Sequence, residues 1–370
     1  MRIIMASSAT GGHIYPALAV AEKVKHRDPD AEILFIGAKK EISSDIVSNA
    51  GYDCKHIDVR GFNRRNMLKN ISVAKDLVAG SSQIKKIIRD FKPDVVFGTG
   101  GYVCGPVVKE AHKMGIRTYI HEQNVVPGMA NKLAEKYADK IFAAFPEAVD
   151  YFKKKDKVIV TGNPVRDVFV NLDKIDYRQL LKIPDGETVI LIFGGSQGAN
   201  AINDAALDFI TEIPAEKNIS VFFITGKRSY WEVSEKLSRL DIKNGKAVHV
   251  LDYTETIHEY FGAANLIVSR SGALTLSEIA VSGRASILVP SPNVTGNHQY
   301  FNAKMLADRG AAVIMNDEEI ANGGLAAKIF ELADDPEKLE KMGNLAKSAA
   351  RTDSADIIFN EIYERKNEQA

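Results

Sequence analysis

The sequence predicts an α/β protein built from two Rossmann-like domains, each with a parallel sheet. Short apolar strands alternate with amphipathic helices along most of the chain, which is typical of doubly wound sheets. At 370 residues the chain is too long for one ordinary core. The alternation restarts after Gly162-Asn163-Pro164. We therefore expect domains at 1–163 and 164–351 that face each other across a cleft, with ligands at the carboxyl ends of their strands.

The first half alternates from its first residues. Pro16 falls in the first turn of a helix, where proline is tolerated. The segment 67–91 has apolar residues at helical spacing near its carboxyl end, which predicts a helix. The strands expected here are 2–6, 31–37, 55–59, 95–98, 118–121, 140–143 and 157–161. The helices expected are 15–26, 45–50, 67–91, 106–113 and 128–136.

The second half follows a polar connection over 171–187. Its expected strands are 189–193, 221–225, 247–251, 266–269 and 286–290. Its expected helices are 200–211, 230–239 and 273–281, and from Glu318 the chain is charged and helical.

Composition excludes several classes of function. The net charge of +0 gives no general attraction to nucleic acid, and no apolar run reaches the roughly 18–20 residues of a membrane span. Two cysteines and a start without the layout of a signal peptide favour a cytosolic chain. The one D-x-D motif, Asp28-Pro29-Asp30, precedes a strand and so lies on the edge away from the ligand. We expect no metal and no cofactor.

Four glycine-bearing turns follow predicted strands, at 10–12, 98–101, 194–198 and 271–272. Glycine lets backbone N–H groups approach a phosphate or a sugar closely. A single turn of this kind is also an ordinary connection, but four on the same sheet edges predict a nucleotide-type ligand. None has the dinucleotide or Walker spacing, so a dehydrogenase or an NTPase is not favoured.

Residues 266–299 form the most informative stretch. An apolar strand leads through Ser271-Gly272 into a helix whose amino end would stabilise an anion such as a diphosphate. Glu278, one to two turns into that helix, could accept hydrogen bonds from two ribose hydroxyls. The alternative is an ordinary turn with a solvated glutamate.

Several polar residues occupy other strand ends. His13 begins a helix, where it suits a neutral general base or a simple packing role. The run His121-Glu122-Gln123-Asn124 suits recognition of sugar hydroxyls, and Arg166 could pair with a phosphate or form a surface ion pair.

Ser196 lies in a G-x-S-x-G pattern, Gly194–Gly198. A serine hydrolase would need an acid and a histidine downstream, such as Asp252 with His258 or His298. The alternative for Ser196 is donation to a phosphate, which needs no triad.

Residues 60–90 are basic, with eight Lys or Arg against two Asp, a local charge of +6. Apolar residues alternate with these charges, and Arg64, Arg65, Lys85 and Lys86 are the candidates for contact with an anionic membrane surface. The alternative is a helix with a core-facing stripe and a solvated basic face.

Seven motifs in sequence order resemble the MurG family of N-acetylglucosaminyltransferases. They are TGGHIYPALA, GTGGYVCGP, HEQNVVPGMANK, TGNPVR, FGGSQGA, RSGALTLSE and GNHQYFNA. The resemblance implies a metal-independent, inverting GT-B enzyme that moves GlcNAc from UDP-GlcNAc to the muramoyl C4 hydroxyl of undecaprenyl-diphospho-muramoylpeptide (lipid I), peripherally at the cytoplasmic face of the bacterial cell membrane. It also implies that a last helix, about 352–370, joins the first, acceptor- and membrane-binding domain, and that 164–351 binds UDP-GlcNAc.

The resemblance also assigns site residues. Thr254 would present backbone atoms to uracil, and Glu278 would contact the ribose. His298 and Gln299 would contact GlcNAc, and Ser196 and Arg166 would contact phosphates. The diphosphate and ribose would lie against Ser271, Gly272, Ala273, Leu274 and Thr275. The acceptor side would comprise Thr10, Gly11, Gly12, His13, Tyr102 and Asn124. The chain departs from the family at Ser7-Ser8-Ala9, where glycine is usual, and at His298, where some members have glutamine.

The implied chemistry is direct displacement of UDP by the acceptor hydroxyl, with His13 as first candidate for the base and Glu122 as second. A UDP-GlcNAc 2-epimerase, another GT-B transferase and a non-catalytic nucleotide-sugar sensor are the alternatives.

Overall fold

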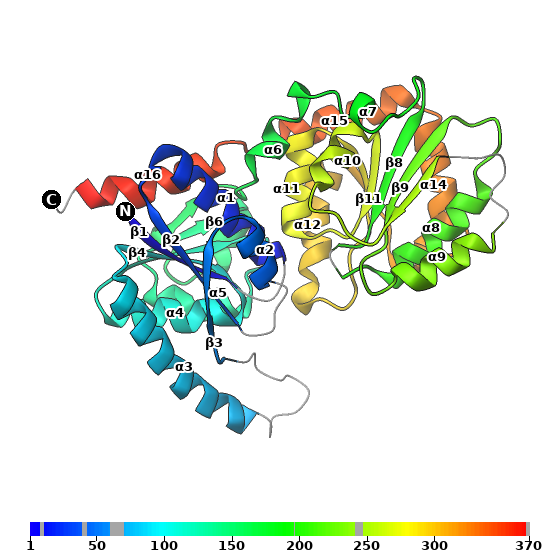
Figure 1. Ribbon diagram of the computed structural model, residues 1–370. Coiled ribbons are helices and arrows are strands. Elements are labelled where there is room, and N and C mark those ends of the chain that lie inside the picture. The colour runs from blue at the N-terminus through cyan, green and yellow to red at the C-terminus, as the bar shows by residue number, and fades with distance from the viewer. Residues whose placement is uncertain (8–10, 39–42, 60–69, 196, 241–246, 368–370) are drawn as a thin grey trace. The chain divides into compact units, whose positions relative to one another are not determined.

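The computed structural model describes residues 1–370 apart from 8–10, 39–42, 60–69, 196, 241–246 and 368–370. The chain divides into two compact units. Unit 1 comprises Met1–Arg166 and Arg351–Ala370, and unit 2 comprises Asp167–Ala350. Each unit is a parallel sheet with helices on both faces, which confirms the predicted architecture (Figure 1).

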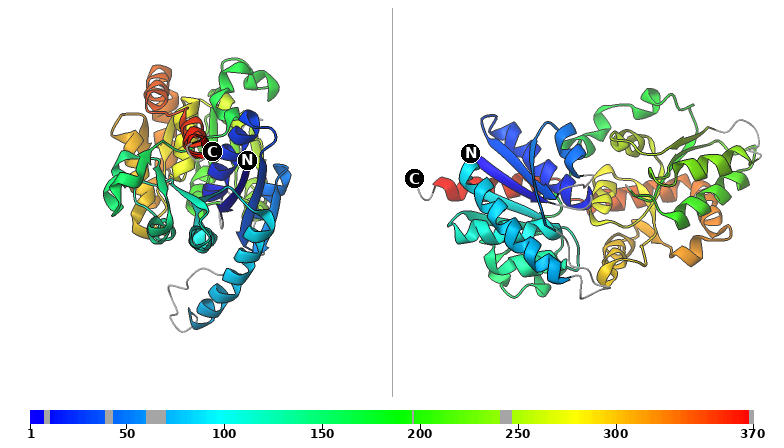
Figure 2. Two further views of the ribbon diagram at one scale, coloured as in Figure 1. Left: turned by 90° about the vertical axis from the view of Figure 1, so that its left-hand side faces the viewer. Right: turned by 60° about the horizontal axis from the view of Figure 1, so that its bottom comes forward.

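Unit 1 contains a sheet with the strand order β3-β2-β1-β4-β5-β6-β7. Its strands are β1 (Arg2–Ser7), β2 (Glu32–Ala38), β3 (Asp53–Ile57), β4 (Val95–Gly100), β5 (Arg117–Glu122), β6 (Lys140–Ala143) and β7 (Val158–Val160). Its helices are α1 (Gly11–Arg27), α2 (Ser43–Asn49), α3 (Asn70–Phe91), α4 (Gly101–Lys113), α5 (Met129–Ala134) and α16 (Ser354–Asn367). Figure 2 shows α3 projecting beyond the sheet of its unit.

Unit 2 repeats this plan with the strand order β10-β9-β8-β11-β12-β13. Its strands are β8 (Thr188–Phe193), β9 (Ile219–Ile224), β10 (Val248–Leu251), β11 (Leu266–Ser269), β12 (Ala285–Leu288) and β13 (Ala312–Ile314). Its helices are α6 (Asp167–Val170), α7 (Tyr177–Leu180), α8 (Asn200–Glu212), α9 (Tyr230–Ser238), α10 (Ile257–Ala263), α11 (Ala273–Ser282), α12 (His298–Ala307), α13 (Asp317–Ile320), α14 (Gly324–Ala333) and α15 (Pro336–Ser348).

Both sheets reverse their strand order at one place. In unit 1 the reversal lies between β1 and β4, and in unit 2 it lies between β8 and β11. Helices leave neighbouring strands toward opposite faces at such a point, so a crevice opens beyond the carboxyl ends of the two strands. These four strands are apolar and almost entirely buried, as expected of central strands covered on both faces.

The last helix, α16, completes unit 1. Ile358 and Ile362 are fully buried in the same apolar cluster as residues of α1. Asp356 forms ion pairs with two basic residues of α1, Lys23 at 3.1 Å and Arg27 at 3.0 Å. These contacts join the two ends of the chain into one core.

Asp28, the first acid of the D-x-D motif, has a structural role. Its Oδ2 accepts from the Tyr363 hydroxyl at 2.8 Å and pairs with the terminal amino group at 3.3 Å. The hydrogen bond from Tyr363 is the main reason that the pKa of Asp28 lies below its usual value. The motif precedes β2, at the amino edge of the sheet.

Several local features differ from the sequence-based expectation. Helices α1 and α4 begin at Gly11 and Gly101, earlier than predicted. Gly100 and Gly101 have φ of +105° and +76°, so β4 turns directly into α4. The polar connection contains the short helix α7, and β13 was not predicted. No helix in the described part of the chain is long and apolar enough to cross a membrane.

Candidate functional site

The glycine turns gather at the two places where strand order reverses. Two of them follow β1 and β4 in unit 1, and two follow β8 and β11 in unit 2. Thr10 and Ser196 belong to these turns but lie outside the described residues. Each unit therefore carries one pair of glycine turns at the edge where doubly wound folds bind ligands.

In unit 1 the first turn of α1 holds His13 against the carboxyl ends of β4 and β5. His13 Nδ1 lies 3.0 Å from Gln123 Oε1, and the His13 backbone carbonyl accepts from the Thr99 hydroxyl at 2.6 Å. A Cβ on Gly100 would lie only 2.9 Å from His13 Nδ1. Glycine is needed at position 100 for two reasons: its φ is positive, and the His13 ring lies too close for a side chain.

Glu122, the second candidate base, is 1% exposed and fully hydrogen-bonded. Its Oε1 accepts from the backbone N–H and the side-chain amide of Asn124, both at 2.9 Å. Its Oε2 accepts from the Gly128 N–H at 3.0 Å and from Asn131 Nδ2 at 2.8 Å. Four donors on one buried carboxylate favour a role in shaping the β5–α5 loop.

The polar run that ends β5 is mostly internal. His121, Glu122 and Gln123 are buried, and only Asn124 is partly exposed. His121 Nε2 donates to the Gly162 carbonyl at 3.0 Å, and burial lowers the pKa of His121 to about 4. All four residues form hydrogen bonds within the protein, and of the four Asn124 has the surface that a ligand could contact.

Arg166 falls at the end of the continuous part of unit 1. Its guanidinium carbon lies 4.6 Å from the ring centroid of Tyr15 in α1. Cation–π packing of this kind places the arginine beside the start of α1, two residues along from His13. Tyr102, in the first turn of α4, is half-buried.

In unit 2 the helix α11 begins directly after the turn that follows β11. Its N-cap residue, Gly272, provides no side-chain cap. The Ser271 hydroxyl is completely buried and has no hydrogen-bond partner among the described residues. Ala273 and Leu274 are buried, and Thr275 is half-buried. This helix terminus offers backbone N–H groups and the positive end of its dipole.

Glu278 lies in the second turn of α11 and is 8% exposed. It is therefore not the solvated glutamate of the simpler interpretation. Thr254 lies after β10, at the same carboxyl edge of the sheet, and its hydroxyl accepts from the Thr256 N–H at 3.1 Å.

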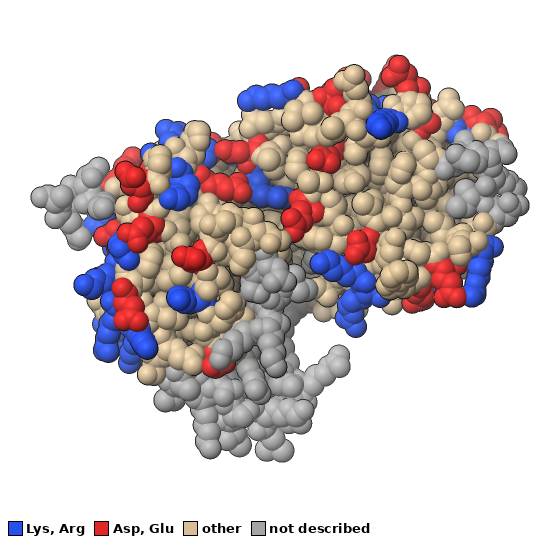
Figure 3. Space-filling model, in the orientation of Figure 1, with Lys and Arg blue, Asp and Glu red and all other residues tan. Residues whose placement is uncertain are grey.

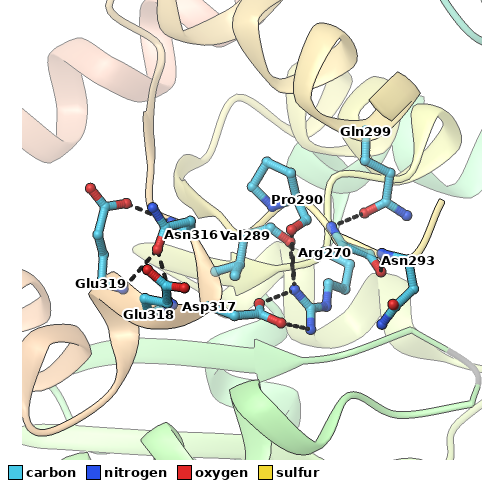
Figure 4. Close-up of polar contacts among 10 residues, drawn as sticks. Arg270, Val289, Pro290, Asn293, Gln299, Asn316, Asp317, Glu318 and Glu319 are labelled. Carbon is cyan, nitrogen blue, oxygen red and sulfur yellow. Dashed lines mark hydrogen bonds and ion pairs between the residues drawn. The ribbon is translucent and has the colours of Figure 1, made fainter. Parts of the chain in front are cut away.

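The loop after β12 is held by residues that the sequence analysis did not single out (Figure 4). Arg270 forms a two-pronged ion pair with Asp317, and its Nη1 also donates to the carbonyls of Val289 and Pro290, both at 3.3 Å. A basic residue between a strand end and a glycine turn is the sequence signal for this contact. Arg270 thus fixes the start of the loop that leads to His298.

Gln299 and His298 begin α12 at the far end of this loop. Gln299 Oε1 accepts from the Ser291 N–H at 2.8 Å, which closes the loop (Figure 4). Its amide nitrogen makes no hydrogen bond to a described residue, so the amide nitrogen is the part of this side chain suited to a ligand. Both side chains are half-buried.

The glycines near Ser196 have a packing role. A Cβ on Gly198 would lie 2.3 Å from the Thr225 carbonyl oxygen, and one on Gly226 would lie 2.4 Å from the Gly198 nitrogen. Two backbones thus meet without side chains between them. The hydrolase alternative gains no support, because Asp252 accepts from the Tyr253 N–H and the His258 ring packs edge-on against Phe169 and Tyr177.

The basic candidates for a membrane contact are only partly described, since Arg64 and Arg65 lie outside the described residues. Lys86 is exposed, whereas Lys85 lies 3.5 Å from the buried Glu110 of α4. Burial opposes ionisation of Glu110, but a hydrogen bond from Ser81 and the charges of Lys113 and Lys85 hold its pKa below the usual value. Figure 3 shows basic and acidic side chains interspersed over the described surface in that view.

Two parallel sheets, each with glycine turns at the carboxyl ends of the strands where its strand order reverses, define a two-domain glycosyltransferase of the GT-B fold. Residues 3–143 match the model of the glycosyltransferase family 28 N-terminal domain, and residues 189–358 match that of its C-terminal domain. The chain is similar over its full length to curated proteins named UDP-N-acetylglucosamine--N-acetylmuramyl-(pentapeptide) pyrophosphoryl-undecaprenol N-acetylglucosamine transferase. It is 38% identical to that of Acetivibrio thermocellus (100% of both chains covered) and 38% identical to that of Thermoanaerobacter sp. strain X514 (98% and 99% covered).

Solved structures agree. The crystal structure of Acinetobacter baumannii MurG matches with a TM-score of 0.74 at 25% identity, covering 98% of this chain and 99% of that one. A Neisseria meningitidis UDP-GlcNAc 2-epimerase bound to UDP-GlcNAc shares the fold, with a TM-score of 0.67 at 18% identity over 98% and 100% of the two chains. The chain belongs to the MurG family.

Proposed function

We propose that this enzyme transfers GlcNAc from UDP-GlcNAc to the muramoyl C4 hydroxyl of undecaprenyl-diphospho-muramoylpeptide, with inversion at the anomeric carbon. The observation that carries the proposal is the similarity to relatives of that name along their full length. The epimerase alternative has only the shared fold in its favour, at 18% identity.

The donor nucleotide is assigned to unit 2. The uncapped start of α11 and the buried Ser271 hydroxyl suit a diphosphate, and the nearly buried Glu278 carboxylate suits the ribose hydroxyls. Thr254 is assigned to the uracil edge, and Gln299 with His298 to the GlcNAc hydroxyls. Ser196 is assigned to a phosphate contact, and so is Arg166, which belongs to unit 1.

The acceptor is assigned to unit 1, at Thr10–Gly12, His13, Tyr102 and Asn124. His13 Nε2 removes the proton of the acceptor hydroxyl while that oxygen attacks the anomeric carbon. The bond from that carbon to the UDP oxygen breaks, and the diphosphate takes up the electron pair. His13 is favoured over Glu122 because the four hydrogen bonds to Glu122 occupy both of its oxygens.

The growing charge on UDP would be stabilised by the N–H groups at the start of α11. One preorganised donor of this kind is typically worth about 2.7–4 kcal/mol in the transition state. No step of the proposed displacement involves a metal.

The acceptor is a lipid, so the enzyme must work at a membrane surface. We assign the cytoplasmic face of the cell membrane, with peripheral attachment through the basic segment that contains Arg64, Arg65 and Lys86. The exposure of Lys86 on α3 supports this assignment.

The test is to incubate the enzyme with UDP-GlcNAc and a short-chain analogue of the lipid acceptor. Formation of the disaccharide product together with UDP is expected. Formation of UDP-ManNAc in the absence of acceptor would identify an epimerase instead. Binding of UDP-GlcNAc without either product would identify a nucleotide-sugar sensor.

A further inference from the structure

A chain of hydrogen-bonded side chains runs from His13 into the interior of unit 1. His13 Nδ1 lies 3.0 Å from Gln123 Oε1, and Gln123 Nε2 lies 3.0 Å from His121 Nδ1. His121 Nε2 then lies 3.0 Å from the Gly162 carbonyl oxygen. Gln123 is 2% exposed and His121 is fully buried. Groups buried so deeply are stable only when they are paired, so each proton in this chain has a defined place.

The orientation of the Gln123 amide follows from its backbone neighbours. Gln123 Nε2 lies 2.9 Å from the Thr99 carbonyl oxygen and 3.1 Å from the His121 carbonyl oxygen. Carbonyl oxygens only accept hydrogen bonds, so the nitrogen of the amide must face them. The opposite orientation would place three oxygens together in a buried position. The Asn163 side chain also holds Gln123, by donating to its backbone carbonyl at 3.2 Å.

The orientation of this amide determines the state of His13. Because Gln123 Oε1 can only accept, the proton of a neutral His13 must lie on Nδ1. Nε2 then carries the lone pair. Along the other branch, the Gly162 carbonyl can only accept, so the His121 proton lies on Nε2. His121 Nδ1 is then an acceptor, and the two hydrogens of Gln123 Nε2 are shared among this nitrogen and the carbonyls of Thr99 and His121. The lowered pKa of the buried His121, about 4, keeps this ring neutral and able to accept at Nδ1.

We infer that Gln123 is a positioning residue of the transfer reaction, which holds His13 in the Nδ1–H tautomer and so makes Nε2 the proton acceptor. His121 holds the Gln123 amide on the side away from His13, through its ring Nδ1 and its backbone carbonyl. The inference rests on the proposed function only for the identity of His13 as the base; the tautomer itself is a property of unit 1. Being uncharged, the amide orients the ring without the charge that a carboxylate partner would add.

The experiment uses the full-length protein with 15N-labelled histidine and two-bond 15N–1H correlation spectra. The His13 signals are assigned by their absence from the His13→Gln variant. Wild-type His13 is expected to show a protonated Nδ1 and a bare Nε2. Gln123→Met, which is similar in size but has neither amide atom, should shift His13 toward the Nε2–H tautomer. Its kcat should fall by about 10–100-fold, as for other residues that orient a ligating or reacting histidine, with an unchanged KM for UDP-GlcNAc.

A matched control is Thr118→Val, at the opposite end of β5. Thr118 is also fully buried, and its hydroxyl donates to the Tyr137 carbonyl at 2.6 Å, away from His13. Thr118→Val should weaken folding while leaving the His13 tautomer and kcat as in the wild type. A loss of kcat in Gln123→Met without a change in tautomer would overturn the inference, since it would reduce Gln123 to a packing residue.

The wild-type spectrum alone is a second test, independent of whether any variant folds. A bare Nδ1 on His13 would overturn the inference directly. The proposed function fails separately, if the wild-type enzyme forms no disaccharide although its His13 carries the proton on Nδ1.

Discussion

The carboxyl edges of the two sheets, where the proposed ligands bind, are built differently in unit 1 and unit 2. In unit 1 the edge is supported by a buried network of side chains, in which His13, Gln123 and His121 form one chain. In unit 2 the edge is mostly backbone: a helix start whose N-cap glycine has no side chain to cap it, and the Ser271 hydroxyl, which has no partner among the described residues. Polar groups that are already satisfied hold a reacting atom in place, whereas unsatisfied ones are available to a ligand. The difference is consistent with the proposed roles, in which unit 1 positions the base and unit 2 binds the nucleotide.

The largest expected effect tests the unit 1 side. His13→Ala should lower kcat by at least ~100-fold, since general-base help contributes about 10²–10⁴-fold. The KM for UDP-GlcNAc should change little, because the nucleotide is assigned to unit 2. Steady-state kinetics with a lipid acceptor analogue measure both. A rise in KM with kcat unchanged would make His13 a binding residue. The proposed difference between the two units would then be wrong.

A second prediction concerns the stability of the same network at low pH. The pKa of His121 in the folded protein, about 4, is below its ordinary value of 6.5. The unfolded chain therefore binds the proton first, so stability is complete above pH 6.5 and is lost as the pH falls toward 4. The full loss amounts to about 3 kcal/mol.

Urea unfolding followed by circular dichroism measures this loss, with His121→Gln as the control. That variant keeps a donor for the Gly162 carbonyl but cannot titrate. The wild type should lose more stability than the variant over this range. Equal losses would show that His121 does not carry the pH dependence.

The third prediction tests the unit 2 side. Glu278→Ala should weaken UDP binding by roughly 1.5–3 kcal/mol, because the lost hydrogen bonds involve a charged group. Titration calorimetry gives the affinity directly. Glu340→Ala, an exposed glutamate on α15 of the same unit, should leave it unchanged. Wild-type affinity in Glu278→Ala would remove Glu278 from the site.

The smallest effect concerns the basic surface of α3. Lys86→Gln should reduce binding to anionic vesicles by about 1 kcal/mol at low salt, and the difference should shrink as salt screens the charge. Vesicle sedimentation measures this. Lys85→Gln should have a smaller effect on binding, since Lys85 lies beside the buried Glu110. Equal binding by wild type and Lys86→Gln would exclude Lys86 from the membrane contact.

The sequence predicted the alternation of strands and helices well, because apolar strands and glycine turns are local signals. Leu266–Ser269, for example, has the predicted bounds in the structure. Contacts between distant residues could not be predicted. The bidentate pair of Arg270 with Asp317 joins residues 47 apart, and His13 and Gln123 are 110 apart. The polar run after β5 also looked suited to a sugar, since sequence alone does not distinguish a buried, satisfied side chain from one that awaits a ligand.

The contribution of α16 to unit 1 has a consequence for synthesis on the ribosome. Unit 2 is one continuous stretch, Asp167–Ala350, whereas unit 1 needs Ile358 and Ile362 to complete its core. Domains generally fold as units once their residues have emerged. Most of unit 1 is translated first, but its core is completed last. A chain released before α16 would therefore have an intact unit 2 and a unit 1 with an open apolar face.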